Sequence, residues 1–354
     1  MKKKVLVLFG GVSSEHEVSL SSACSVIKNI PADKYEVIPM GITKDGRFYL
    51  YKGSPDMLPD ENWLRDEKNL IPAVISCDRS HHGIIRLTDG EIEKIDAVFP
   101  VLHGKNGEDG TMQGLLEIAG LPYVGCDTAS SAVCMDKAVT NAMMDLSGVA
   151  QAKWVSFDKN AYSADKEALL KNAAEKLGFP IFVKPANAGS SVGISKAKSL
   201  AELEEACEKA FEHDKKLVLE EGIVGMEVEC AVLGNDEPIA SVVGEVVPCN
   251  EFYDYEAKYL ANESELIIPA GLPEEVLNSI RETAIRVYKI LGCSGLTRVD
   301  FFVRSSDGAI MLNEPNTIPG FTSISMYPKL FAASGIPYSE LLDRLIELAI
   351  QKHQ

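Results

Sequence analysis

The sequence lacks the residue spacings that mark a zinc site or a disulfide framework. Its 8 cysteines include no C-x-x-C pair, and its 6 histidines include no H-E-x-x-H segment. Several cysteines, among them Cys24, Cys230 and Cys293, lie in apolar surroundings instead. We therefore expect reduced, buried thiols, as in a protein of the cytoplasm.

The sequence also has too little positive charge for a face that binds nucleic acid or an anionic membrane. Lys and Arg total 35 against 52 Asp and Glu, which gives a net charge of −17 and a pI near 4.9. Both partners require a basic surface, so we expect neither. No apolar run approaches the about 20 residues of a membrane-spanning helix. The run at residues 5–9 is too short for a signal peptide and is interpreted as a buried strand.

The rest of the composition is that of an ordinary globular protein, with 46% hydrophobic and 25% charged residues over 354 positions. That length predicts two or three domains. Up to Cys126, strand and helix patterns alternate, which predicts an α/β domain with a parallel, doubly wound sheet. Strands are expected at residues 5–9, 35–42 and 97–102, and helices at 18–30 and 111–119. Residues 62–93 are polar and irregular, and no element is assigned there.

Two further units follow without a low-complexity linker, so we expect the domains to pack tightly. The second unit begins with a helix at about 130–146. Its strands are expected at residues 153–157, 181–184 and 217–220, and its other helices at 166–176 and 200–212. The third unit is rich in strands, expected at residues 228–233, 239–247, 297–303 and 309–313, with helices at 274–291 and 339–350.

The third unit contains a predicted hairpin, in which LTRVDFFV is joined to MLNEPN by the turn sequence SSDG. Side chains two positions apart on a strand share a face, as Arg298 and Asp300 do. Glu314 and Asn316 do so on the other strand. Asp300, Glu314 and Asn316 supply the hard oxygen ligands that Mg²⁺ prefers, and Arg298 could face a phosphate or an oxyanion. Two alternatives stay open, namely a polar strand end without a ligand and an Arg298–Asp300 salt bridge without a metal.

A glycine- and serine-rich stretch, KPANAGSSVGIS, follows the apolar run at residues 179–183. Backbone N–H groups of such a loop can bind phosphate oxygens, and Lys184 adds a positive charge. The stretch is not a Walker A loop, because GxxxxGK[ST] is absent. A flexible hairpin turn is the alternative.

Two loops of the first unit carry ionisable side chains at the ends of strands, where ligands bind in α/β sheets. In HGKNGEDGT, His103 is a candidate site residue or a hydrogen-bonding partner of the loop, and Glu108 and Asp109 are interpreted as helix-start acids. In FGGVSSEHEVS, the glycines do not complete GxGxxG, which disfavours a nicotinamide-dependent oxidoreductase. Glu15 in that loop suits the ammonium group of a small substrate, with helix capping as the alternative.

A tyrosine-rich stretch, EFYDYEAKYL, crowds Tyr253, Tyr255 and Tyr259 among charged residues. This pattern indicates an ordered loop, and loops of this kind often close over sites. A surface loop with half-buried tyrosines is the alternative.

Together, these blocks resemble D-alanine–D-alanine ligase of the ATP-grasp superfamily. The resemblance covers essentially the whole chain, in order through FGGVSSEHEVSLSS, HGKNGEDGTMQGLLE, CMDK, KPANAGSSVGI, FYDYEAKY, RVDFF and NEPNTIPGFTSISMYP. It implies a Rossmann-like domain with a parallel sheet at residues 1–127, followed by two ATP-grasp domains at 128–220 and 221–354 that enclose ATP. It also implies ATP-dependent joining of two D-alanines through a D-alanyl phosphate, for peptidoglycan synthesis in the cytoplasm, by a homodimer joined through its N-terminal domains.

The resemblance assigns roles to the residues that match its motifs. For ATP, it implies phosphate-binding lysines, acids near adenine and ribose, and backbone that lines the base: Lys137, Lys184, Glu220, Glu227, Glu221 and Ile223. For two Mg²⁺ ions, with Mn²⁺ as a substitute, it implies the ligands Asp300, Glu314 and Asn316. For the first D-alanine and its ammonium group, it implies Glu15, His103, Ser190 and Tyr259. For the oxyanion it implies Arg298 and the backbone of Gly320, and for the carboxylate of the second amino acid Ser325 and Lys258. Tyr253 is expected as a further substrate-binding residue.

The motifs specify the second substrate less directly, since related ligases use D-lactate or D-serine in place of the second D-alanine. Tyr259 disfavours the D-lactate type. Met326 favours D-alanine, because the similar D-serine subgroup carries an arginine there and a methionine cannot donate a hydrogen bond. The blocks VFPVLHGKNGEDGT and VGCDTASSAVCMDK nevertheless resemble that subgroup, so a D-alanine–D-serine ligase is the alternative. A non-catalytic ATP-binding protein would be expected to have lost a charged site residue, and all are present.

Overall fold

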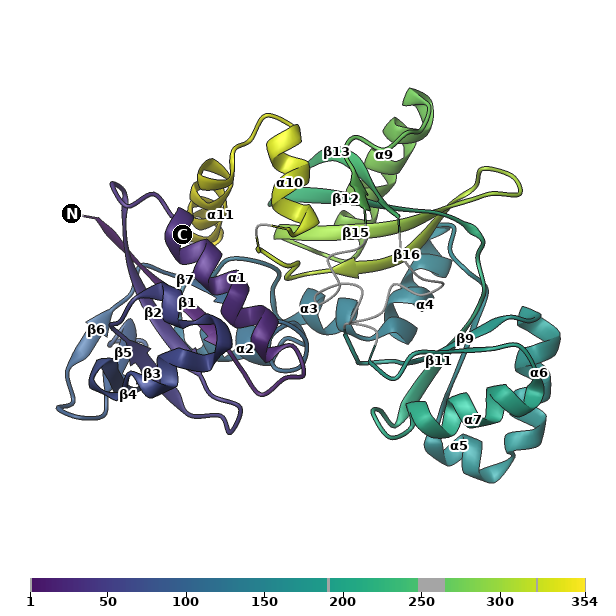
Figure 1. Cartoon of the computed structure of the whole chain (residues 1–354), viewed down its shortest axis with the longest axis horizontal. Helices are drawn as coiled ribbons and strands as arrows, with labels where there is room; N and C mark the ends of the chain where they lie inside the picture. The colour runs from purple at the N-terminus through teal and green to yellow at the C-terminus, as the bar shows by residue number, and fades with distance from the viewer. Residues whose placement is uncertain (1, 190–191, 248–264, 323, 354) are drawn as a thin grey trace.

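The computed structural model describes residues 2–189, 192–247, 265–322 and 324–353. In these residues the strands form three sheets that follow one another along the chain and are flanked by helices (Figure 1). The site predictions at Ser190, Tyr253, Lys258 and Tyr259 lie outside the described residues. The domain limits after residues 127 and 220 stay predictions, and the second falls inside strand β11 (Lys216–Glu221).

The first sheet has the strand order β6-β5-β4-β3-β2-β1-β7. Its strands are β1 (Lys3–Gly10), β2 (Tyr35–Ile42), β3 (Phe48–Tyr51), β4 (Leu70–Ile75), β5 (Gly83–Arg86), β6 (Ile92–Lys94) and β7 (Ala97–Val101). Its helices are α1 (His16–Asn29) and α2 (Thr111–Ala119), with 3₁₀ turns at Pro55–Met57, Pro59–Arg65 and Glu67–Asn69.

The predicted parallel arrangement holds for β2, β1 and β7 only. Strands β3 to β6 pair antiparallel, so the sheet is mixed. The prediction of a sheet that is parallel throughout was therefore wrong for these four strands. Strands of three or four half-exposed residues give too few positions for a clear hydrophobic period, which is why most of this region received no assignment.

The helix expected at 130–146 is in fact two helices, α3 (Thr128–Met135) and α4 (Lys137–Ser147). Asp136 interrupts them with an extended backbone, and its side chain accepts the N–H groups of Ala138 at 3.1 Å and Val139 at 3.2 Å. Aspartate is a preferred N-cap because its oxygen satisfies N–H groups that have no partner within the helix. The break makes Lys137 the first residue of α4.

The second and third sheets are antiparallel, with the orders β10-β9-β11-β8 and β14-β13-β12-β15-β16. The second contains β8 (Trp154–Asp158), β9 (Ile181–Pro185), β10 (Ser195–Ala197) and β11, with helices α5 (Lys159–Ala164), α6 (Lys166–Leu177) and α7 (Leu200–Ala210). The third contains β12 (Gly225–Gly234), β13 (Ile239–Val247), β14 (Glu265–Ile267), β15 (Gly295–Arg304) and β16 (Ile310–Asn316), with helices α9 (Glu274–Ile290), α10 (Met326–Ala333) and α11 (Tyr338–Lys352).

Strands β15 and β16 form the predicted hairpin, and Asp300 pairs with Glu314. A bulge follows this pair, because Phe301 is opposite Leu312 and Asn313 has no opposite residue. Leu312 and Glu314 would share a face in a regular strand. The extra residue instead lets Leu312 join the core beside Phe301 while Glu314 lies beside Asp300.

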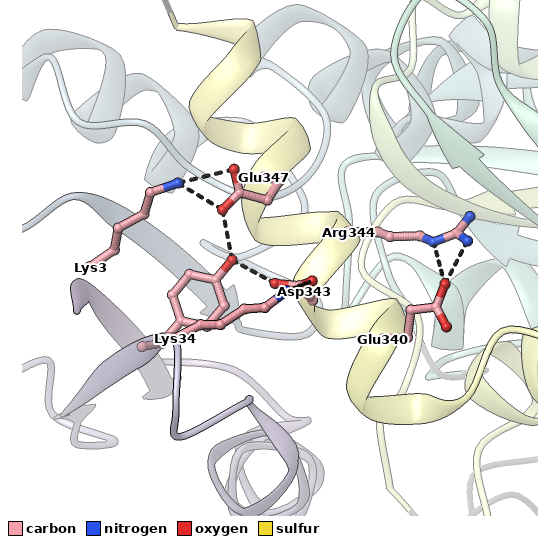
Figure 2. Close-up of polar contacts among 7 residues, drawn as sticks. Lys3, Lys34, Glu340, Asp343, Arg344 and Glu347 are labelled. Atoms are coloured by element: carbon pink, nitrogen blue, oxygen red, sulfur yellow. Dashed lines mark hydrogen bonds and ion pairs between the residues drawn. The ribbon is translucent and has the colours of Figure 1, made fainter. Parts of the chain in front are cut away.

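Helix α11 returns the end of the chain to the first domain, where it lies beside α1 (Figure 1). One buried cluster combines residues of β1, β7 and α1 with Leu341, Leu345 and Ile346 of α11. Figure 2 shows the polar border of this contact, where Lys3 lies 2.7 Å from Glu347 and Lys34 lies 2.6 Å from Asp343. The domains therefore pack tightly, as expected.

Replacing Tyr35 with phenylalanine is expected to lower the free energy of unfolding by about 1.5 kcal/mol. The Tyr35 hydroxyl lies 2.8 Å from a carboxylate oxygen of both Asp343 and Glu347, at a buried position. Urea unfolding would measure the loss. Glu340→Gln is the control, because it breaks the exposed Arg344–Glu340 pair on the same helix (Figure 2) and should cost less than about 0.5 kcal/mol. Equal losses in both variants would contradict the prediction.

Within the described ranges, no helix combines the length and apolar character needed to cross a bilayer. The seven cysteines described there are free thiols, and all except Cys77 are buried. The predicted burial of Cys24, Cys230 and Cys293 is therefore confirmed.

Candidate active site

A cavity of about 350 Å³ lies between the first domain and the third sheet, beside the end of β16. Eight sequence-predicted site residues line it: Glu15, His103, Lys137, Arg298, Glu314, Asn316, Gly320 and Ser325. Six other predicted residues with described positions do not: Lys184, Glu220, Glu221, Ile223, Glu227 and Asp300. Residues up to 310 positions apart in the chain are thus brought to one cavity by the return of the third sheet to the first domain.

Arg298 is the centre of a buried ion-pair network on the hairpin. Its Nε and Nη2 each donate to an oxygen of Asp300 at 2.7 Å, and Nε also lies 3.0 Å from Glu229 of β12. Asn316 Nδ2 donates to Asp300 at 2.9 Å. The salt bridge considered as an alternative for this pair therefore forms. Sequence analysis did not identify Glu229, although it is an acid within an apolar strand. The same signal identified Asp300.

The hairpin carries oxygen-bearing side chains of the kind that a hard cation prefers. Three carboxylates, those of Glu229, Asp300 and Glu314, lie on one side of the sheet. Arg298 pairs with two of them and Lys137 Nζ lies 3.7 Å from Glu314, so one negative charge is left in excess among these five groups. Nowhere in the described ranges do three His, Cys, Asp or Glu side chains converge on a metal position. The predicted set is instead two carboxylates and a carboxamide, whose oxygens suit Mg²⁺.

Two lysines lie on the central-domain side of the hairpin. Lys137 Nζ donates to the carbonyl of Ala188, within the glycine- and serine-rich stretch, at 2.8 Å. The Lys184 side chain is 13% exposed, and its Nζ lies 2.6 Å from Glu220. Burial lowers the pKa of Lys184, but the carboxylates of Glu220, Glu314 and Glu227 together raise it above its ordinary value. Lys184 therefore stays charged and lies within electrostatic reach of the hairpin acids.

Strands β11 and β12 carry the other residues predicted for the nucleotide. Glu220 accepts a hydrogen bond from Asn141 of α4 at 3.1 Å, a partner that the sequence gave no sign of. The Glu221 side chain accepts the backbone N–H of Lys153 at 2.9 Å, and the N–H of Glu221 donates to the Lys153 carbonyl at 3.0 Å. Ile223 is half-buried between β11 and β12.

On the first domain, Glu15 occupies the N-cap position of α1 but makes no side-chain capping bond, so the capping alternative is not observed. Its carboxylate is buried and contacts the backbone of two glycine loops. A Cβ added at Gly104 would lie 2.4 Å from Glu15 Oε2, and one at Gly189 would lie 2.7 Å from it. The carboxylate thus lies where the first and central domains meet.

His103 is neutral and its tautomer follows from its partners. Nδ1 lies 2.9 Å from the Ile318 carbonyl, which can only accept, so Nδ1 carries the hydrogen. Nε2 lies 3.2 Å from the Ser22 hydroxyl. The oxygen of the same hydroxyl accepts the N–H of Phe321 at 3.3 Å. Burial lowers the pKa of His103, against the opposite effect of Glu15. His103 therefore holds the segment after β16 through hydrogen bonds to its backbone and to Ser22.

Glu108 is not only a helix-start acid, which corrects the sequence-based interpretation. Its Oε2 accepts the N–H of Gly104 at 2.8 Å, and its Oε1 accepts the N–H of Ile318 at 3.0 Å. It also lines the cavity. Burial and then the charge of Glu15 raise the pKa of Glu108 to about 8. A spacing pattern could not reveal this role, because Ile318 is 210 residues away.

The segment after β16 ends in a small hydroxyl network. The Ser325 hydroxyl accepts the N–H of Thr322 at 2.9 Å and lies 2.8 Å from the Thr322 hydroxyl. Gly320 lies against it, since a Cβ there would lie 2.7 Å from Ser325 Oγ. Met326, the first residue of α10, is 5% exposed and lines the cavity. The structure thus brings Gly320, Ser325 and Met326 together.

Solved structures share this architecture over the full length. The VanG D-Ala:D-Ser ligase from Enterococcus faecalis is 47% identical, with a TM-score of 0.90 over 99% of this chain and 100% of that chain. The D-alanine-D-alanine ligase from Coxiella burnetii is 38% identical, with a TM-score of 0.87 over 100% of this chain and 96% of that chain. The fold is therefore an ATP-grasp fold preceded by a mixed α/β domain.

Sequence comparisons identify the family. Residues 4–126 match the D-ala D-ala ligase N-terminus and residues 143–347 match the D-ala D-ala ligase C-terminus. D-alanine--D-alanine ligases from Caldicellulosiruptor bescii and Acetivibrio thermocellus are 53% and 51% identical, covering 100% and 99% of this chain and 96% and 97% of their own lengths. The chain belongs to the D-alanine–D-alanine ligase family.

Proposed function

We propose that this protein joins two D-alanine molecules to D-alanyl-D-alanine at the expense of ATP, for peptidoglycan synthesis. The observation that carries the proposal is that one cavity is lined by Glu15 from the first domain and by Arg298 and Glu314 from the hairpin. An acid for an ammonium group, a guanidinium for an oxyanion and oxygen ligands for a cation are what such a ligation requires. Family membership supports the same activity.

In the first step, a carboxylate oxygen of the first D-alanine attacks the γ-phosphorus of ATP, and ADP leaves. Glu15 holds the ammonium group of this D-alanine, while Lys137 and Lys184 bind phosphate oxygens. Because the charged Lys184 side chain is only 13% exposed, its interaction with phosphate is weakly screened by water. Bound by Asp300, Glu314 and Asn316, two Mg²⁺ ions would offset the charge of the transferred phosphoryl group.

In the second step, the amine of the second D-alanine attacks the carbonyl of the acyl phosphate, and phosphate leaves. Negative charge develops on the carbonyl oxygen, where the guanidinium of Arg298 and the N–H of Gly320 stabilise it. A guanidinium has five N–H donors, more than its two carboxylate partners need. Ser325 binds the carboxylate of the second D-alanine, and neutral His103 keeps the adjoining segment in place.

The proposal is tested by phosphate release with ATP, Mg²⁺ and D-alanine, repeated with D-serine or D-lactate in competition and with products identified by mass. D-alanyl-D-alanine as the main product is the expected result. D-alanyl-D-serine as the main product would favour the alternative suggested by the likeness to the Enterococcus faecalis structure. No phosphate release with any D-amino acid would favour a non-catalytic ATP-binding protein. Loss of activity in EDTA and its return with Mg²⁺ or Mn²⁺ would test the metal.

Met326→Arg is expected to raise the rate ratio of D-serine to D-alanine about tenfold, the effect of about 1.4 kcal/mol. The arginine adds a donor for a serine hydroxyl in a cavity wall that otherwise has a thioether. Competition between the two acceptors measures the ratio. Met326→Leu is the matched control, since it keeps the size and adds no donor. An unchanged ratio in Met326→Arg would contradict this role.

Two further properties belong to the proposal. The protein is expected to act in the cytoplasm and to form a homodimer through its first domain. Sedimentation equilibrium distinguishes a species of twice the 38.5 kDa chain mass from a monomer.

A further inference from the structure

The side chain of Glu108 joins two loops that come from opposite ends of the chain. Gly104, bonded to Oε2, lies in the loop after β7, and Ile318, bonded to Oε1, lies in the segment after β16. Both bonds are made by backbone N–H groups to the two oxygens of one carboxyl group, so a single side chain joins the two loops directly. In the described part of the chain, no strand pairing joins the two loops at this point.

Each of the two loops lies at a different part of the proposed reaction site. The loop after β7 contacts the carboxylate of Glu15, since a Cβ at Gly104 would lie 2.4 Å from Glu15 Oε2. The segment after β16 leads from Ile318 to Gly320, whose N–H is proposed to bind the oxyanion. The distance between the ammonium site and the oxyanion site therefore depends on how these loops are joined.

We propose that Glu108 is a positioning residue that keeps the ammonium site of the first domain in register with the oxyanion segment after β16. The inference rests on the proposed function. His103 makes a parallel connection, from the same loop to the Ile318 carbonyl at 2.9 Å. Ile318 is thus held from both sides of its backbone, with its N–H on Glu108 and its C=O on His103.

The consequence concerns the fate of the acyl phosphate. A displacement of about 1 Å between reacting groups can cost about 10²-fold in rate, so a loosened segment slows attack by the second amine. An acyl phosphate that waits is hydrolysed by water instead, because water is a competing nucleophile. Glu108 therefore governs how many ATP molecules are consumed per dipeptide formed.

The test is Glu108→Gln, assayed for released phosphate and for dipeptide in the same reaction. Glutamine keeps the length of the side chain but faces one of the two N–H groups with an NH₂ group, which cannot accept. We expect kcat to fall about tenfold to 10²-fold and the ratio of phosphate to dipeptide to rise above one. The KM for ATP should change less than twofold, because neither of the two loops that Glu108 joins carries a proposed nucleotide residue.

Asp109→Asn is the matched control. The Asp109 carboxylate accepts the N–H groups of Asn106 at 2.8 Å and Thr111 at 3.1 Å, within the same loop only. The Asp109→Asn variant should therefore keep a phosphate-to-dipeptide ratio of one. Glu108→Asp is a second probe, since it keeps the carboxyl group but is one methylene too short to reach both N–H groups. It should raise the ratio even if Glu108→Gln folds poorly.

A ratio of one in both Glu108 variants would overturn the inference, whatever the change in kcat. A rise in the ratio that Asp109→Asn shares equally would also overturn it, because the effect would then belong to the loop as a whole. Failure of the proposed function is a different result, in which the wild-type protein forms no dipeptide from ATP and D-alanine. Thermal unfolding of each variant separates a loss of folded protein from a loss of coupling.

Discussion

Arg298→Lys is expected to lower kcat for dipeptide formation about 10²- to 10³-fold, the usual effect of removing an oxyanion donor. Lysine keeps one positive charge between Glu229 and Asp300 but lacks the planar fork that bonds both oxygens of Asp300. Phosphate release and dipeptide yield measure the loss. The substitution to lysine is preferred to alanine, since leaving the two buried acids unpaired would cost about 3–5 kcal/mol of unfolding free energy.

The same strand offers a control for this substitution. Arg304 pairs with Asp307 through Nε at 2.9 Å and Nη2 at 2.7 Å, in the exposed turn of the hairpin and away from the cavity. Arg304→Lys should leave kcat within about twofold of the wild type, because exposed pairs contribute little. A full-rate Arg298→Lys enzyme would contradict the oxyanion role. Equal losses in the two variants would show that the hairpin itself had been disturbed.

Lys184→Met is expected to reduce phosphate release about 10²- to 10³-fold, with a higher KM for ATP. The substitution removes a buried positive charge from the proposed phosphate site and leaves Glu220 without its cation. Phosphate release over a range of ATP concentrations separates the two effects. Lys216→Met, on the neighbouring strand β11, is the control, because it removes a lysine that is paired with Asp136 and has no proposed role in nucleotide binding.

The loss in Lys184→Met could come from a destabilised protein as well as from lost phosphate binding. Adding Glu220→Gln to Lys184→Met removes the uncompensated buried charge, so stability should recover. Activity should stay low, because the phosphate site still lacks its lysine. If phosphate release recovered along with stability, the role of Lys184 would be structural.

The hairpin site could be predicted from a short stretch of sequence because its information is local. A turn sequence between two strand patterns fixes which residues face each other to within one position, and the observed pairing of Asp300 with Glu314 lies within that limit. The bulge at Asn313 could not be predicted. It results from a conflict between Leu312, which the core requires, and Glu314, which faces Asp300, and the sequence does not say how the conflict is resolved.

Contacts between distant segments were beyond sequence reasoning for a different reason. The bonds of Glu108 to Ile318 and of Arg298 to Glu229 depend on how whole sheets pack, which no local period records. The break at Asp136 was missed because both helices keep a continuous apolar pattern across it. Aspartate followed by a helical pattern is nevertheless a known start signal, and it could have indicated α4.

The return of α11 to the first domain has a consequence for biosynthesis. Domains commonly fold one after another as the chain leaves the ribosome, starting at the N-terminus. Here the buried cluster that contains β1 and α1 also includes Leu341, Leu345 and Ile346, which are made long after β1 and α1. The first domain therefore completes its core only after α11 has left the ribosome, and until then the face of α1 that packs against α11 stays uncovered.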